Sequence, residues 1–377
     1  MTTTAAQQTL SEKQSFYRPE LDVLRFFAFF MVFIFHVTFR DAGFYSARGV
    51  PAGLANLLAA LSRAGDMGVD LFFLLSAYLI TTLLLRERAS MGTVNLRAFY
   101  IRRILRIWPL YFLAIGLGGF YFLISPSDYF PRRYVIAFLF LVGNWMYVFH
   151  GTPGSPFALL WSVAVEEQFY LTWPVLLRKL SSRRALLLFG LCLLSFTIGA
   201  RIYISRGPYL GEAIWVNTAT RLDGIALGIM IAAGLRTKIP SIAPIPRALL
   251  VAAGFFGFLF VGGLFTRGQL PPVRWVFTAH ALTAALFFFA TLGVSFAPRS
   301  LIYLGKISFG LYVYHALCIR ISGFILGNRM KSYAGYFMHI AISLAVTIVI
   351  ASVSYRFFES PFLRLKERFT SIESRPV

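Results

Sequence analysis

The sequence predicts an all-α integral membrane protein that folds as one bundle of about ten membrane-spanning helices. Hydrophobic residues make up 58% of the 377 positions and charged residues 14%, and the mean hydropathy is +0.70. A soluble domain is about one quarter charged, and it has no interior large enough for this much apolar surface. The apolar residues recur in runs of about twenty, the length that a helix needs to cross roughly 30 Å of hydrocarbon.

These apolar runs follow one another with short connections, which predicts a single transmembrane domain over residues 21–357. A polar segment, 1–20, precedes this domain, and a short tail, 358–377, follows it. The predicted spans are Leu21–Thr38, Met67–Leu85, Ile107–Ser125, Phe157–Leu177, Ala185–Ser205, Thr218–Leu235, Ala248–Phe265, Trp275–Ala297, Ile302–Leu326 and Ala334–Phe357.

One further apolar segment, Val135–Phe149, is too short and too interrupted to be a regular span. Gly143 and Asn144 break it. As a full span it would also place the basic cluster Arg178–Arg184 outside, although Lys and Arg favour cytoplasmic connections. We therefore expect a re-entrant or interfacial segment that enters from the outer side, with its irregular backbone covered by protein or water.

With this choice, the basic residues orient the chain with both termini in the cytoplasm. More than half of the 36 Lys and Arg residues then lie in cytoplasmic segments, and fewer than a third lie in outer loops. The net charge is +21, and the basic residues lie between apolar spans. The charge therefore indicates contact with the cell membrane and its anionic lipids rather than with nucleic acid. The two cysteines, Cys192 and Cys318, lie in apolar runs and predict neither a disulfide nor a metal site.

Ionisable side chains occur inside several predicted spans, where burial in hydrocarbon costs several kcal/mol and marks functional candidates. Arg25 lies near the cytoplasmic end of its span. The others lie in the middle or the outer half of theirs: His36, Asp70, Glu166, Glu167, Arg201, Arg221, Asp223, His315 and Arg320. One interpretation is a set of ion pairs that hold helices together. The other is a polar cavity, in which histidines and acids at similar depth transfer protons.

Arg25 and His36 form a pair with a useful spacing. Eleven residues of helix make three turns plus about 20°, so both side chains lie on one face, separated by about 16 Å along the axis. This distance is comparable to an extended pantetheine arm. Coenzyme A would then place its phosphates on cytoplasmic arginines and its thioester beside His36. A packed, hydrogen-bonded histidine is the alternative interpretation of the same residue.

Several motifs surround these residues, in a fixed order along the chain. They are Tyr17–Arg25 followed by His36, Gly68–Ser76, Phe99–Tyr111, Trp161–Tyr170, Arg221–Gly224, Gly305–Tyr312 and Tyr355–Phe362. Together they resemble the membrane-bound acyltransferase family 3, whose members carry acyl groups, often acetyl, from cytoplasmic acyl-coenzyme A to glycans, lipid-linked sugars or macrolides. The chain departs from the family pattern at Ala77, where glycine is usual, and at Ser360, where arginine is common.

The resemblance implies that the donor is acyl-coenzyme A, acetyl-coenzyme A in the first instance, and that no metal takes part. Arg25 would belong to the transfer site, and Arg102, Arg103 and Arg106 would face the donor at the cytoplasmic mouth. The chemistry agrees with these roles, because guanidinium groups bind phosphate through paired, charge-assisted hydrogen bonds.

The resemblance also places His36 at the transfer point, with Glu166 and Glu167 close by. His36 would act as the general base on an acceptor hydroxyl, oriented by one of the two glutamates. An acyl-histidine intermediate is equally compatible. Adjacent residues point about 100° apart on a helix, so one glutamate is expected to be structural, and we favour Glu167 as the catalytic one.

A further set of polar residues is assigned to the substrate cavity. Ser76, Trp161 and Gln168 are alternative donors for the oxyanion that forms during transfer. The set is Asp70, Ser76, Trp161, Gln168, Arg221, Asp223 and His315.

The predicted function is therefore O-acyl transfer to a hydroxyl of an extracytoplasmic or lipid-linked glycan, or of a macrolide-like acceptor. The alternative is a transporter of a sugar, lipid or acyl group, since buried charge in a cavity serves transport as well. The sequence leaves the acceptor, the acyl group and the oligomeric state open.

Overall fold

A computed structural model describes residues 16–124, 131–180, 182–207, 212–236, 238–264, 273–295 and 297–370. Within these ranges the chain forms helices and no strand. Each predicted span overlaps a helix, although the bounds differ. These helices are α1 (Pro19–Val37), α4 (Met67–Met91), α5 (Leu96–Ile124), α8 (Leu160–Lys179), α9 (Arg183–Ile204), α11 (Asp223–Leu235), α12 (Pro244–Leu264), α13 (Val273–Thr291), α15 (Ser308–Leu326) and α16 (Tyr333–Ser354).

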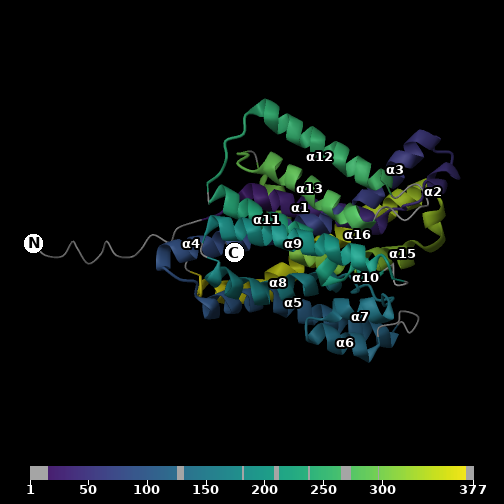
Figure 1. Cartoon of the computed structure of the whole chain (residues 1–377). Helices are drawn as coiled ribbons and strands as arrows, with labels where there is room; N and C mark the ends of the chain where they lie inside the picture. Colours follow the sequence, from purple (N-terminus) through teal and green to yellow (C-terminus); the bar gives the residue numbers. More distant parts are fainter. Residues whose placement is uncertain are drawn as a thin grey trace, which may run out of the picture.

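Shorter elements join these helices or cover their ends. They are α2 (Ala42–Ser46), α3 (Ala52–Ala64), α6 (Arg132–Leu139), α7 (Gly143–His150), α10 (Glu212–Trp215), the 3-10 turns Thr218–Thr220 and Gly327–Lys331, α14 (Arg299–Lys306), the π-helical turn Tyr355–Glu359 and α17 (Ser360–Glu367). Figure 1 shows the long helices running side by side, with α12 and α13 at one edge of the bundle and α5, α6 and α7 at the other.

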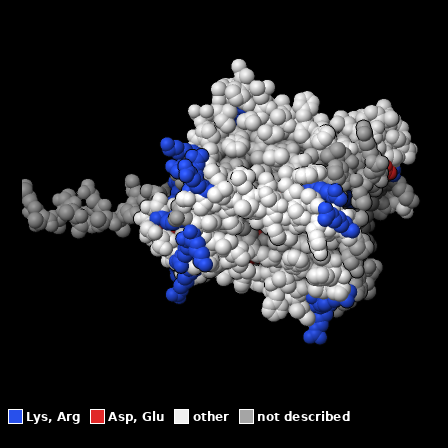
Figure 2. All heavy atoms as spheres, viewed as in Figure 1, with Lys and Arg blue, Asp and Glu red and all other residues white. Residues whose placement is uncertain are grey.

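The surface has the character of a membrane protein. Six helical stretches in the described ranges are long and apolar enough to cross a bilayer: Ala52–Met91, Leu96–Phe120, Arg183–Ile204, Pro244–Gly263, Ser308–Met330 and Tyr333–Glu367. Their outer faces expose large apolar side chains, such as Leu188 and Phe196 on α9 and Phe256 and Phe260 on α12. Figure 2 shows Lys and Arg gathered at the two ends of the visible face, with a broad uncharged zone between them. We therefore describe the chain as a helical membrane protein.

Three segments differ from simple spans in informative ways. The Val135–Phe149 segment is two short helices, α6 and α7, separated at Phe140–Val142, in agreement with the predicted interruption. The predicted span Ile302–Leu326 divides at Ile307 into α14 and α15. The span predicted from Thr218 becomes helical at Asp223, which leaves only 13 residues in α11.

Helix α4 is the centre of the bundle, because it packs against α1, α11 and α13. Its contact with α11 depends on Gly224 and Gly228, four residues apart on α11. A Cβ atom at these positions would lie 2.6 Å from the Asp70 carbonyl oxygen and 2.5 Å from that of Leu74. Small residues spaced in this way allow two membrane helices to approach backbone to backbone. The close approach brings the polar residues of α11 next to those of α4.

Helix α14 holds the start of α1. A Cβ atom at Gly305 would lie 2.0 Å from the Asp22 carbonyl oxygen, so only glycine permits this contact. Just before α1, Phe16 is 2% exposed, so the last residues of the predicted 1–20 segment pack against the bundle. The predicted tail likewise begins with a helix, α17, that packs on α5. Residues 1–15 and 371–377 lie outside the described ranges.

Candidate active site

A cavity lies between α1, α4, α5, α8 and α15, and its empty space is about 1110 Å³, including the part open to solvent. Residues Phe16–Arg18 close one side of it. The α4 wall is mainly apolar, with Phe72, Phe73 and Leu79 facing the space. Because part of this space is open to solvent, a ligand can enter the cavity from the surface.

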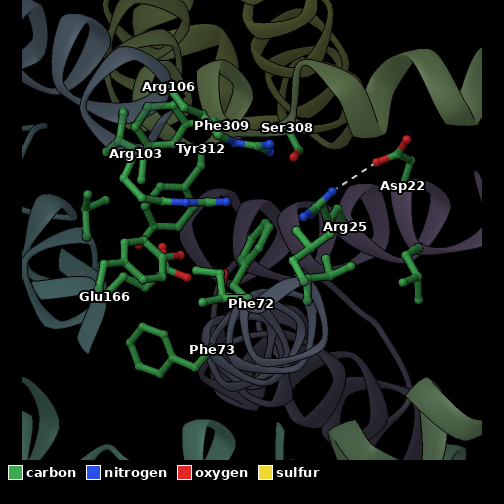
Figure 3. A pocket seen from close by; sticks show the side chains of 18 of the residues that line it. Asp22, Arg25, Phe72, Phe73, Arg103, Arg106, Glu166, Ser308, Phe309 and Tyr312 are labelled. Carbon is green, nitrogen blue, oxygen red and sulfur yellow. Dashed lines mark hydrogen bonds and ion pairs between the residues drawn. The ribbon is translucent and has the colours of Figure 1, made fainter. Parts of the chain in front are cut away.

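Four arginines line the cavity: Arg18, Arg25, Arg103 and Arg106. Arg103 and Arg106 are three residues apart on α5, so they project from the same face of that helix. Figure 3 shows the guanidinium groups of Arg25, Arg103 and Arg106 pointing towards the same central space. Two acids, Asp22 and Glu166, line the cavity too, so arginine charge exceeds carboxylate charge and the cavity favours an anion.

The individual arginines differ in how they are engaged. Arg25 donates to Asp22 at 3.1 Å, one turn away on α1 (Figure 3). The Nε atoms of Arg18 and Arg103 are buried and have no hydrogen-bond partner among the residues that the structure describes. A buried guanidinium N–H without a partner carries the full cost of desolvation, so an anionic ligand that accepts from it would be bound strongly.

Glu166 lies on the same cavity, with Ser76 of α4 and Tyr170 of α8 as lining neighbours. One of its carboxylate oxygens, Oε1, is buried without a hydrogen-bond partner. Glu167 points away from the cavity, and its Oε2 accepts a hydrogen bond from the Trp108 indole at 2.8 Å. The expected division between the two glutamates is therefore present, but Glu166, and not the favoured Glu167, is the one that lines the cavity.

A hydrogen bond between two of the lining residues crosses the bundle. The hydroxyl oxygens of Ser162 on α8 and Tyr312 on α15 are 2.6 Å apart. The Tyr312 ring also packs edge-on against Phe72, with 5.8 Å between ring centroids. Tyr312 also contacts the next polar group along α15, since its ring centroid lies 5.7 Å from that of His315.

That next group is a pair of histidines. His315, one turn beyond Tyr312, is fully buried, and its Nε2 lies 3.3 Å from Nδ1 of His36. His36 Nδ1 also lies 2.8 Å from the Val32 carbonyl oxygen. The His36 side chain is exposed, and it is not among the residues that line the arginine-lined cavity. No hydrogen bond joins His36 to Glu166 or Glu167 among the described residues, and His315 is the histidine's side-chain partner instead.

A separate buried network contains three other predicted residues. Arg221 lies 3.2 Å from Asp70, which in turn lies 3.2 Å from His280 Nδ1. Arg201 forms a bidentate pair with Asp223, at 2.5 and 2.9 Å. All five side chains are fully buried. This arrangement matches the ion-pair interpretation of these spans, and it holds α4, α9, α11 and α13 together.

The remaining predicted residues lie apart from the cavity. Gln168 donates to the Leu141 carbonyl at 2.8 Å and to Asn144 at 2.9 Å, which ties α8 to the α6–α7 segment. Arg102 donates to Glu87 at 2.9 Å and to the Phe369 carbonyl at 2.8 Å, on a smaller pocket next to the main cavity. The Trp161 ring lies beside Arg221, 5.4 Å from its guanidinium carbon.

Sequence reasoning missed several cavity residues: Phe16, Tyr17, Arg18, Ser162, Tyr170 and Tyr312. Five of the six belong to the motifs described above, which is the signal that was available. Phe16 and Arg18 precede the first apolar run. They lie in a polar segment, and a polar segment does not predict packing against the helix bundle. Tyr170 and Tyr312 end two of the motifs, but the sequence alone does not distinguish a tyrosine that lines a cavity from one at the membrane interface.

Comparisons with known proteins agree with the motif pattern. The family model described as "Acyltransferase domain" matches residues 18–356. A relative from Staphylococcus aureus, named provisionally as an O-acetyltransferase, is 28% identical over 97% of this chain. A Bacillus subtilis protein, named provisionally as a peptidoglycan O-acetyltransferase, is 30% identical over 92% of this chain and 55% of its own length.

The peptidoglycan O-acetyltransferase of Listeria monocytogenes is 28% identical over 92% of this chain and 56% of its own length. The chain spans about 60% of the length of the first curated relatives that it matches. No solved structure is significantly similar to it. Since the family model covers nearly all of the described residues, the chain belongs to the acyltransferase family that this domain defines.

Proposed function

We propose that the chain is a membrane O-acyltransferase that takes an acyl group, acetyl in the first instance, from acyl-coenzyme A in the arginine-lined cavity and delivers it to a hydroxyl beside His36. The observation that carries this proposal is the position of Arg25 and His36 on one continuous helix, α1. Arg25 lines the cavity. His36 lies eleven residues further on and contacts His315, whose ring packs against the lining residue Tyr312.

The cavity suits the donor in charge and in shape. Coenzyme A carries phosphates, which favour the guanidinium groups of Arg18, Arg103 and Arg106. Its pantetheine arm is uncharged and slender, which suits the space beside Phe72 and Leu79. The rise along α1 from Arg25 to His36 is about 16 Å, so a donor held by its phosphates at the arginines extends its thioester towards the histidines.

The chemistry requires one base and a route for one proton. The acceptor hydroxyl gives its proton to His36 while its oxygen bonds to the thioester carbonyl carbon. The carbon–sulfur bond then breaks, and the leaving thiolate takes the proton back. The products are an ester and free coenzyme A, so atoms and charge balance without an added cofactor. Ser162, Tyr312 and Ser76 are the nearest hydroxyl donors for the oxyanion.

The positive charge distribution supports an orientation with the arginine-lined cavity at the cytoplasmic side and the His36 end facing outwards. Both termini are then cytoplasmic, in the cell membrane. The names of the relatives from Bacillus subtilis and Listeria monocytogenes favour peptidoglycan, a glycan rich in free hydroxyls, as the acceptor.

Transfer of labelled acetyl from acetyl-coenzyme A to envelope material tests this proposal. Membranes with wild-type protein should incorporate label, and His36→Ala should lose it by roughly 10²- to 10⁴-fold, the contribution of a general base. His150→Ala is the matched control, because His150 is an exposed histidine far from the cavity lining. Equal incorporation by wild type and His36→Ala, at equal protein amounts, would exclude His36 as the base.

A further inference from the structure

The His36 ring is held by its Nδ1 atom. This nitrogen lies 2.8 Å from the Val32 carbonyl oxygen, one turn earlier on α1. A carbonyl oxygen only accepts hydrogen bonds, so Nδ1 must carry the hydrogen. In the neutral ring the other nitrogen, Nε2, then has the lone pair. Among the described residues Nε2 has no hydrogen-bond partner.

His315 is oriented by the same logic. Its Nδ1 lies 2.6 Å from the Tyr312 carbonyl oxygen, so this nitrogen also carries the hydrogen. Its Nε2 is therefore an acceptor, and it faces His36 Nδ1 at 3.3 Å. This distance is long because His36 Nδ1–H is shared with the closer Val32 carbonyl. Edge-on packing against Phe29, at 5.9 Å between ring centroids, holds the His315 ring in place.

The two imidazoles thus form a chain with one direction, from the exposed Nε2 of His36 to the buried Tyr312 carbonyl. We propose that His315 is a positioning residue: as the second acceptor of the shared Nδ1–H, it acts together with the Val32 carbonyl to hold His36 in the Nδ1–H tautomer, so that Nε2 is the atom that takes the proton from the acceptor hydroxyl. The inference rests on the proposed function, and it identifies Nε2 as the atom of His36 that acts as the general base. When His36 becomes imidazolium, its Nδ1–H gains a stronger hydrogen bond to His315.

The geometry excludes His315 as a relay that carries the proton further inward. A relay must pass a proton on from its far nitrogen, but Nδ1 of His315 faces a carbonyl that accepts and does not ionise. His315 is also fully buried. The proton therefore stays on His36 until the leaving thiolate removes it. The other charged groups that act on His36 are Asp66, at the start of α4, and Arg40, which follows α1.

Two substitutions of nearly equal size separate positioning from packing. In His315→Gln, the side-chain amide oxygen reaches the place of the imidazole Nε2 and remains an acceptor for His36. In His315→Asn, the shorter amide reaches only the place of Nδ1, so the Tyr312 contact survives and the acceptor for His36 is lost. We expect His315→Gln to keep acetyl transfer within about threefold of wild type and His315→Asn to lose at least tenfold, part of the general-base contribution.

His339→Gln is the matched control for replacing a buried histidine. His339 is 7% exposed, and its Nδ1 lies 3.1 Å from the Ser322 hydroxyl, away from the cavity lining. It should keep wild-type activity. All variants are compared in the same membranes at equal protein amounts, with thermal unfolding in detergent as the check on folding.

The tautomer itself is measured by nitrogen-15 solid-state NMR of membranes that contain labelled histidine. His36→Ala identifies the His36 signals by their loss. At about pH 8.5, two units above the pKa of free histidine, wild-type His36 should show a protonated Nδ1 and an unprotonated Nε2. His315→Asn should populate the opposite tautomer as well.

The outcomes separate the inference from the proposed function. If His36→Ala abolishes transfer while His315→Asn and His315→Gln are equally active, His36 remains the base and the positioning role of His315 is wrong. A hydrogen on Nε2 of His36 in the wild-type spectrum overturns the inference whatever the activities are. If His36→Ala is fully active, the proposed function of His36 fails first.

Discussion

Replacing Arg103 with glutamine separates donor binding from structural roles among the arginines. Arg103 lines the cavity, and its buried Nε has no hydrogen-bond partner. A hydrogen bond from a guanidinium to a phosphate is worth about 1.5–3 kcal/mol. At 1.4 kcal/mol for each factor of ten, Arg103→Gln should raise the KM for acetyl-coenzyme A by about 10- to 150-fold.

The same substitution should leave stability unchanged or slightly raise it. Arg103 forms no ion pair within 4 Å among the described residues, and Glu166 and Glu167 act on it only at longer range, so its replacement removes a desolvation cost and only a weak attraction in the unliganded protein. The assay is initial-rate transfer at varied acetyl-coenzyme A, together with the midpoint of thermal unfolding in detergent. Arg103→Lys should recover part of the affinity, since it retains the charge and loses the bidentate geometry.

Arg102→Gln is the matched control on the neighbouring residue. Arg102 already donates to Glu87 and to the Phe369 carbonyl, so its loss should lower the melting temperature, with a smaller effect on KM. The reasoning would be refuted if Arg103→Gln left KM within twofold of wild type. A second result would also refute the reasoning: a rise in KM for Arg103→Gln that comes with a matching loss of stability, which is the pattern expected for Arg102→Gln.

Three further changes test the packing around the site. Gly228→Leu should prevent close contact of α11 with α4, because a Cβ atom would lie 2.5 Å from a carbonyl oxygen. The yield of folded protein in detergent should fall sharply, and an unchanged yield would contradict this expectation. Asp223→Asn removes the carboxylate that pairs with buried Arg201, which should cost about 3–5 kcal/mol of stability. The melting temperature should therefore fall, and an unchanged melting temperature would contradict this expectation. Trp108→Phe leaves Glu167 Oε2 without its hydrogen-bond donor, which should lower stability by about 1–3 kcal/mol and change KM little. A change in KM without a loss of stability would instead indicate that Glu167 contacts the acyl donor.

Much of the helical framework follows from hydropathy alone, because an apolar run of sufficient length has few alternatives to a helix in a membrane. The exceptions have local causes. Leu222 and Arg221 precede the helix that begins at Asp223, since Asn217 caps a short 3-10 turn there through its side chain. The break at Ile307 places Gly305 against the backbone of α1, a tertiary contact that hydropathy does not encode.

The site was less accessible to sequence reasoning than the fold. The face shared by Arg25 and His36 follows from helix geometry, and the separation of Glu166 from Glu167 follows from the 100° turn between neighbours. Which of the two glutamates faces the cavity depends on the rotation of α8 against its neighbours. The contact between His36 and His315 joins residues 279 positions apart, and no local pattern carries that information.

The hydrogen bond between Ser162 and Tyr312 has a consequence for the cell that is separate from catalysis. A donor site on one side of a membrane and an acceptor site on the other invite a continuous water column, and such a column conducts protons and dissipates the membrane potential. On the proposed route from the arginine-lined cavity to the histidine pair, Tyr312 is the residue that contacts both: it lines the cavity and packs against His315, and Ser162 and Phe72 hold it in place. If the donor and the acceptor bind on opposite sides, as proposed, the acyl group has to displace these side chains as it passes. Energy coupling across the membrane is preserved as long as the opening is never wider than the chain that passes through it.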